Sequence, residues 1–280
     1  MSKRITINGA SLHYNDTETD LPALVTLHGA PGMSSSAGDW RVFASLADQY
    51  RIISYDQRGS GSSDLRGPFS FEQFCADLEE LRRKLDLGTI TIAGGSYGGM
   101  IALQYATRFQ HNLHAVVLRD TAASNDFEHL ARDNALNSPY VTDHEGLERM
   151  FAGETHSDDD FRELIRQIMP LYNVIKDPER DAEAVAAMQI HHETHNYAFK
   201  INNYNYDLRP LLPFLDVPVL ITVGRHDWVT PLPASEEIHA GLPNSELVIF
   251  ENSGHSPQVE EHDLWIATVR RFLSRHVPRS

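Results

Sequence analysis

Short apolar runs alternate with amphipathic stretches along most of the chain. Runs of four or five residues end in glycine, aspartate or other turn-forming residues, and these are Leu24–Leu27, Arg51–Tyr55, Thr89–Ala93, Ala115–Arg119, Val219–Val223 and Glu246–Phe250. Such runs between turn signals are typical of buried strands. Two further short runs, Ile5–Ile7 and Ser11–Tyr14, flank Asn8-Gly9 and predict a leading β-hairpin.

Helical periodicity fills the intervals between these runs. Ser70 with Gln73 predicts a capped helix start, followed by an apolar stripe of Phe71, Phe74, Cys75, Leu78, Leu81 and Leu85. Met100–Phe109 and Leu264–Leu273 have the same pattern. Strands that alternate with helices indicate βαβ units and a mostly parallel central sheet flanked by helices. Because Cys75 belongs to the stripe, we interpret it as a packing residue.

The pattern changes between residues 121 and 207, where strand signals disappear. Amphipathic helices replace them, as in the stripe of Phe161, Leu164, Ile165, Ile168 and Met169, and the strand pattern resumes at Pro218. Ligands of open α/β sheets bind at the carboxyl ends of the strands. We therefore predict an α/β core of residues 1–120 and 208–280, with residues 121–207 as a helical cap over the strand ends.

Composition narrows the classes of partner. The 280 residues contain 39 acidic and 24 basic side chains, a formal net charge of −15, which disfavours nucleic acids and anionic membrane surfaces. The single cysteine excludes an intrachain disulfide. Met1–Ile7 does not resemble a signal peptide, and no apolar run reaches 18 residues. These features predict a cytoplasmic protein with a small-molecule or short-peptide substrate, and leave its oligomeric state open.

The segment Gly94-Gly-Ser96-Tyr-Gly98 is a G-x-S-x-G sequence between a predicted strand and a predicted helix. In that context a serine occupies a sharp turn, and the glycines two residues before and after it allow the backbones to approach. A glycine-rich strand-to-helix turn without chemistry would have the same letters. The motif therefore indicates a catalytic serine only if a base and an acid for Ser96 are also present.

A nucleophilic serine needs a base that takes its proton and an acid that orients the base. Asp227 follows the run ending at Val223, and His255 follows the last predicted strand. The chain order Ser, Asp, His is the one that this kind of strand–turn–helix arrangement uses. We predict Ser96 as nucleophile, His255 as base and Asp227 as acid, with Asp120, at the end of another strand, as the alternative acid.

Acyl transfer also needs two backbone N–H groups for the oxyanion, each worth about 3–4 kcal/mol. We predict one from Tyr97, directly after the nucleophile. The other is predicted from Ala30, in the turn-rich segment His28-Gly-Ala-Pro-Gly32.

Two other segments resemble known site motifs but lack a required feature. His191-His-Glu-Thr-His195 lacks the His-Glu-x-x-His arrangement of a zinc site, so we predict no metal. Gly29-Ala-Pro-Gly-Met-Ser lacks the lysine of a phosphate-binding loop, which excludes nucleotide hydrolysis by that route.

Taken together, five segments resemble the proline iminopeptidase branch of the α/β hydrolases: His28–Gly32, Asp56–Ser62, Gly94–Gly99, Gly224–Asp227 and Gly254-His255. The resemblance implies an α/β-hydrolase fold and cofactor-free release of an N-terminal residue, with lid carboxylates holding the substrate amine. It places Glu193, ahead of an aromatic stretch, as one amine anchor. The usual loop is His-Gly-Gly-Pro-Gly, from which Ala30 departs.

Three hypotheses follow for the function. The first is an aminopeptidase that acts on a small peptide or amide, and the second is a carboxylic-ester or lactone hydrolase that uses the same triad. The third is a catalytically silent binding protein on the same scaffold. Convergence of Glu193 and a second carboxylate above Ser96 would favour the first hypothesis, and an apolar pocket the second.

Overall fold

A single sheet organises the molecule. The computed structural model describes residues 3–278, so Met1 and Ser2 of the N-terminal stretch discussed above lie outside it. Within this range the sheet has eight strands in the order β1-β2-β4-β3-β5-β6-β7-β8. Their bounds are β1 Lys3–Ile7, β2 Ala10–Asp16, β3 Ala23–Leu27, β4 Arg51–Tyr55, β5 Ile90–Gly95, β6 Leu113–Arg119, β7 Val219–Gly224 and β8 Ser245–Phe250.

The pairing separates a parallel body from an antiparallel edge. β1 pairs with β2, and β2 with β4, in antiparallel fashion. All pairs from β4 to β8 are parallel. The parallel strands therefore place their carboxyl ends along one edge, where the loops after β3, β5, β7 and β8 meet.

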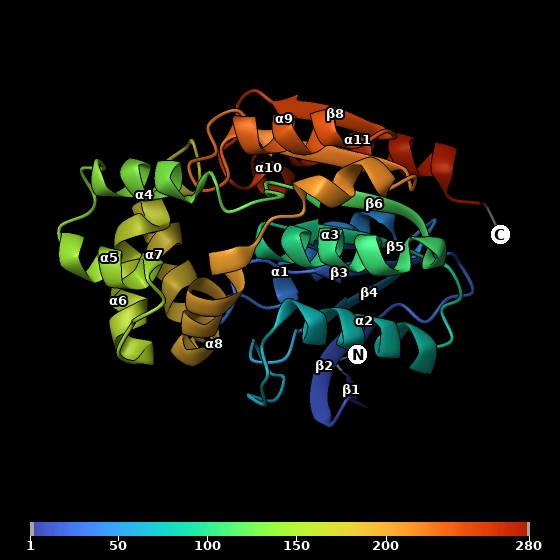
Figure 1. Ribbon diagram of the computed structural model, residues 1–280, viewed down its shortest axis with the longest axis horizontal. Helices are drawn as coiled ribbons and strands as arrows, with labels where there is room; N and C mark the ends of the chain where they lie inside the picture. The colour runs from blue at the N-terminus through green and yellow to red at the C-terminus, as the bar shows by residue number, and fades with distance from the viewer. Residues whose placement is uncertain (1–2, 279–280) are drawn as a thin grey trace.

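Helices cover both faces of the sheet (Figure 1). On one face, α2 (Phe71–Lys84), α3 (Tyr97–Phe109) and α9 (Leu232–Gly241) bury residues such as Leu78, Ile101 and Ile238 against it. On the other face, α1 (Ala37–Phe43) and α11 (His262–His276) contribute Phe43 and Trp265 to a second core. Their rings pack edge to face at 5.4 Å. These two apolar layers hold the strand ends in fixed positions.

A helical segment connects β6 to β7 and lies at one end of the sheet (Figure 1). Its elements are α4 Glu128–Leu136, α5 His144–Phe151, α6 Asp158–Ile168, the 3₁₀ turn η3 Met169–Leu171, α7 Pro178–Ala187, α8 His192–Tyr197, the π-helical turn η4 Ala198–Asn202 and the 3₁₀ turn η5 Asn203–Asn205. It buries its own apolar cluster, which includes Leu147, Phe161 and Ile165, and Trp228 of the β7 side packs into it. The bounds 121–207 that we assign to a cap remain a prediction.

Most of the sequence-based elements are confirmed, including the mostly parallel central sheet with helices on both faces. β4 begins and ends at the predicted residues, and the Asn8-Gly9 hairpin is present. At the start of α2, the Ser70 hydroxyl accepts from the Gln73 N–H. The remaining elements are the 3₁₀ turns η1 Ala44–Leu46, η2 Gln110–Asn112 and η6 Arg209–Phe214, and helix α10 Pro257–Glu260.

No helix within residues 3–278 has the length and apolar character needed to cross a membrane.

Candidate active site

Ser96 occupies the turn between β5 and α3. Its φ of 53° lies in the left-handed region, which a non-glycine residue rarely adopts. A Cβ at Gly98 would lie 2.0 Å from the Leu27 carbonyl oxygen, and one at Gly94 would lie 2.3 Å from the Gly98 carbonyl oxygen. Only glycine fits at both positions, which explains the spacing around the serine. The turn leaves the Ser96 side chain partly exposed, on the wall of a cavity.

His255 and Asp227 form a buried pair in the loops after β8 and β7. The His255 Nδ1 lies 2.9 Å from both carboxylate oxygens of Asp227. Since a carboxylate only accepts, Nδ1 carries the proton and Nε2 is left to act as a base. The carboxylate also accepts from the Val229 N–H at 2.8 Å and from the Thr230 hydroxyl at 2.8 Å. Asp227 is thereby fixed in orientation, and it fixes the imidazole.

Tyr172 of the helical segment holds His255 from the other side. Its carbonyl oxygen accepts the His255 backbone N–H at 2.9 Å, and its ring meets the imidazole edge to face at 5.5 Å. His255 and Ser96 line the same cavity, although no hydrogen bond joins their side chains in this structure. Hydrogen bonds of this kind are often long before a substrate binds.

The charge state of His255 predicts a pH dependence. Burial disfavours the charged ring, but the charge and hydrogen bond of Asp227 outweigh it, so the pKa of His255 is raised above the ordinary 6.5. A protonated ring cannot accept the Ser96 proton. We expect kcat/KM, and the rate of labelling by a fluorophosphonate, to fall as the pH drops through a midpoint above 6.5. A midpoint below 6.5 would contradict the His255–Asp227 pairing as the source of the base.

Asp120, the alternative acid, lies beside this pair. One oxygen or nitrogen from each of Asp120, Asp227 and His255 fits within 4.8 Å of the others. Asp120 accepts the Gly224 N–H at 2.9 Å through Oδ1, while its buried Oδ2 has no partner. Burial and the adjacent Asp227 carboxylate raise the pKa of Asp120 well above its usual range. Asp227, and not Asp120, contacts the imidazole, so the geometry favours Asp227 as the orienting acid.

Ala30 and Tyr97, the predicted oxyanion donors, line the same cavity as Ser96. Ala30 has a φ of 45°, and a Cβ on the preceding Gly29 would lie 2.9 Å from the Ser96 Cβ. Tyr97 is the first residue of α3, and its ring is buried against Phe71 at 5.1 Å. Among residues 3–278 neither N–H donates a hydrogen bond within the chain. Both groups are therefore not engaged by the chain itself, and their role in binding an oxyanion stays a prediction.

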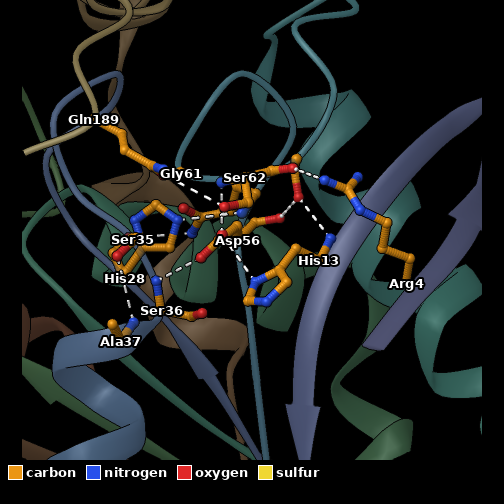
Figure 2. A network of polar contacts seen from close by, with 12 residues as sticks. Arg4, His13, His28, Ser35, Ser36, Ala37, Asp56, Gly61, Ser62 and Gln189 are labelled. Carbon is orange, nitrogen blue, oxygen red and sulfur yellow. Dashed lines mark hydrogen bonds and ion pairs between the residues drawn. The ribbon is translucent and has the colours of Figure 1, made fainter. Parts of the chain in front are cut away.

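A buried polar network holds the loop that carries Ala30 (Figure 2). Asp56, directly after β4, accepts the Ser36 N–H at 2.7 Å and the Ser62 N–H at 2.8 Å. Its Oδ2 also lies 3.0 Å from Nδ1 of His13, on β2. Figure 2 shows Asp56 between these groups. The carboxylate thus joins the N-terminal hairpin, the start of α1 and the loop after β4.

His28 also supports the loop that carries Ala30. Its Nε2 accepts the Gln57 N–H at 3.2 Å, and its Nδ1 donates to the Gly29 carbonyl at 2.9 Å. The Gln57 side-chain amide donates to the His28 carbonyl at 3.1 Å. Burial lowers the pKa of His28, consistent with a neutral ring that both donates and accepts. Asp56 and Gln57 therefore support the loop that carries Ala30, whereas Arg58 pairs with Asp77 of α2.

A cavity of about 290 Å³ lies over Ser96, between the strand ends and the helical segment. Apolar side chains dominate its lining, and its carboxylate is Glu128, at the start of α4. Glu193 does not reach it. α8 turns Thr194 and His195 inward, and the Glu193 side chain lies exposed on the outer face. This position does not support Glu193 as an amine anchor, because each step of one residue along a helix turns the side chain by about 100°, and Glu193 lies one step before the buried Thr194.

The three histidines around Glu193 contact different groups. His191 Nε2 donates to the Gly61 carbonyl at 3.2 Å, His192 Nδ1 lies 2.7 Å from Asp158, and His195 Nε2 lies 2.9 Å from the Met150 carbonyl. The three imidazoles therefore have three separate partners.

Comparison with known proteins agrees with this architecture. The family model for the alpha/beta hydrolase fold matches residues 22–262. A proline iminopeptidase, PfmaB, from Pestalotiopsis fici is 31% identical over 98% of this chain and 100% of its own length. A proline iminopeptidase from Lactobacillus acidophilus is 27% identical over 95% of each chain. The solved structure of an esterase from Exiguobacterium antarcticum superposes with a TM-score of 0.79 at 25% identity, covering 98% of this chain and 100% of the esterase.

Proposed function

Because the chain belongs to the alpha/beta hydrolase fold family and is a hydrolase, we propose that it is a serine hydrolase that works through an acyl-enzyme. One observation carries the proposal: His255, held by the buried Asp227, lines the same cavity as Ser96 on its strained turn. This combination supplies a nucleophile, a base and an acid from three different loops of the sheet.

The proposed mechanism assigns each group one task. His255 Nε2 takes the proton of Ser96 as its hydroxyl oxygen attacks the carbonyl carbon. The N–H groups of Ala30 and Tyr97 stabilise the oxyanion, and Asp227 stabilises the imidazolium. The imidazolium then protonates the leaving group, and the acyl-enzyme forms. His255 next activates a water molecule that hydrolyses this ester and restores Ser96.

The lining of the cavity supports an ester or lactone as the substrate. An ammonium group taken from water needs a paired negative charge. Glu193 lies outside the cavity, and burial raises the pKa of Glu128, which makes a charged carboxylate there less favourable. Neutral esters and lactones need no such partner. We therefore propose carboxylic-ester or lactone hydrolysis as the main activity.

An aminopeptidase is the second candidate. The relatives from Pestalotiopsis fici and Lactobacillus acidophilus are named proline iminopeptidases. Glu128, although burial disfavours its charge, is a carboxylate on the wall of the cavity and would be the anchor for an amino group in place of Glu193.

A substrate panel separates the two candidates. We expect p-nitrophenyl esters or small lactones to be hydrolysed at least about 100-fold faster, in kcat/KM, than prolyl or alanyl p-nitroanilide. Glu128→Gln should change ester turnover by less than about threefold, as should the control Glu183→Gln on the exposed face of α7. Efficient anilide turnover that is lost in Glu128→Gln, and lost when the substrate amine is blocked, would establish the aminopeptidase instead.

A further inference from the structure

Methionines from five separate segments between residues 33 and 188 converge on the cavity. Five of the six methionines of the sequence line it, namely Met33, Met100, Met150, Met169 and Met188. They come from the loop after β3, from α3, from α5, from η3 and from the end of α7. These five segments are far apart in the sequence, and each contributes a methionine to the same cavity. The lining therefore has a specific chemistry beyond being apolar.

Thioether side chains suit a large, ring-containing ligand. Methionine is unbranched and polarizable, adapts its shape at low cost, and its sulfur makes favourable contacts with aromatic rings. Aromatic rings add to this wall, since Phe161 and Phe199 flank His195 with ring centroids at 4.1 and 4.4 Å. Burial lowers the pKa of His195 to about 4, so this ring is neutral near pH 7. The part of the wall formed by Phe161, His195 and Phe199 therefore offers a flat, uncharged surface.

The volume agrees with a ligand of two rings. An engineered apolar cavity of about 150 Å³ accommodates one benzene molecule. The cavity over Ser96, at about 290 Å³, is nearly twice as large. An acetyl group or a single five-membered ring would leave most of it empty, and would forgo most of the contacts that the methionines provide.

The position of the methionines indicates which part of the substrate they meet. His255 protonates the leaving group, so the leaving group lies beside His255 and Asp227. None of the five methionines comes from residues 208–280, the part that carries those two side chains. That part lines the cavity with residues such as Trp228, Ser256 and Gln258. Met33 and Met100 each follow a predicted oxyanion donor, Ala30 or Tyr97, by three residues, so the methionine lining begins beside the substrate carbonyl, and we place the acyl group against it.

We propose that the substrate is an ester or lactone of a bulky, ring-containing apolar carboxylic acid, with an acyl group the size of two fused rings held by the five methionines. This inference rests on the proposed hydrolase function and specifies its acyl group.

The first test varies only the acyl group of p-nitrophenyl esters: acetyl, octanoyl, benzoyl and 2-naphthoyl. We expect kcat/KM to rise at least tenfold from acetyl to benzoyl and again to 2-naphthoyl, with octanoyl below 2-naphthoyl. A preference for acetyl or for octanoyl would overturn the inference while leaving the hydrolase in place. Absence of any hydrolysis that depends on Ser96 would overturn the proposed function itself.

The second test does not require turnover. The Ser96→Ala variant should bind 2-naphthoate at least tenfold more tightly than acetate or octanoate by calorimetry. Filling the cavity with Ala131→Leu, at a buried lining position, should weaken 2-naphthoate binding at least tenfold and spare acetate. Ala186→Leu, on the exposed side of α7, is the matched control. Equal binding of the three acids to a folded Ser96→Ala protein would refute the methionine-lined acyl site.

Discussion

Replacing Ser96 with alanine should lower kcat/KM for the best ester by about 10⁴-fold or more, because the nucleophile is lost while binding and the oxyanion hole remain. The protein should stay folded. Alanine keeps the Cβ and so adopts the φ of 53° at a cost similar to that of serine. No hydrogen bond of the Ser96 hydroxyl is lost, since among residues 3–278 its side chain has none. Steady-state kinetics and a thermal melt of the same sample measure both quantities.

Ser274→Ala, on the exposed surface of α11, controls for the loss of a hydroxyl elsewhere. A Ser96→Ala protein with near-normal turnover would remove Ser96 from the mechanism. Failure of a fluorophosphonate to label Ser96 in the unaltered protein would point to the catalytically silent binding protein, the third hypothesis raised by the sequence.

Replacing Asp227 with asparagine should reduce kcat by about 10⁴-fold. An asparagine amide donates as well as accepts, so it favours the wrong tautomer of His255 and removes the charge that stabilises the imidazolium. Because the charge and hydrogen bond of Asp227 then no longer offset the burial of His255, the acid limb of any residual activity should move to lower pH. A pH profile of the variant measures both changes.

Asp120→Asn is the matched comparison, since Asp120 is as deeply buried and lies in the same cluster. The raised pKa of Asp120 favours a protonated, uncharged acid, and an amide has nearly the same shape. Its Oδ1 can still accept the Gly224 N–H. We expect less than about a tenfold loss of kcat. A severe loss in Asp120→Asn with a mild one in Asp227→Asn would reverse the assignment of the acid.

The sheet and its strand ends could be predicted from the sequence because each is a local pattern. Apolar runs ending in turn residues fixed β4 to the residue and β7 to within one. Chain order and placement at strand ends then brought Asp227 and His255 to one place, and the structure shows them 2.9 Å apart. A βαβ sheet has few ways to arrange its carboxyl ends, so local patterns are sufficient there.

The cavity wall could not be predicted in the same way. Its residues come from helices whose rotation about their axes depends on tertiary packing, and amphipathic periodicity does not say which partner the apolar face meets. Glu193 illustrates this, because its neighbour His195 is buried and Glu193 itself is exposed. Glu128 was missed because nothing local marks it, since it is one glutamate among 39 acidic residues. The sequence likewise did not show that five methionines from separate segments line one cavity.

The role of Asp56 required the structure for another reason. The segment Asp56–Ser62 contributed to the family resemblance, but a resemblance does not show which groups Asp56 contacts. The structure shows that the Asp56 carboxylate accepts hydrogen bonds from the Ser36 and Ser62 N–H groups. Buried carboxylates that accept several hydrogen bonds are costly to remove, and this one acts through the loop that carries Ala30.

The backbone angles of the site bear on how this chain was shaped by selection. Six described residues other than glycine have positive φ, and three of them are Ala30, Ser96 and Asp120. A left-handed conformation costs a non-glycine residue about 1–2 kcal/mol, which glycine would avoid. Selection for thermodynamic stability alone would favour glycine at all three positions. At Ser96 this cost is tied to the proposed chemistry, because glycine there would give a more stable protein that has lost its nucleophile. Ala30 contributes only a backbone N–H, which glycine would keep, so the same cost there has no such chemical reason.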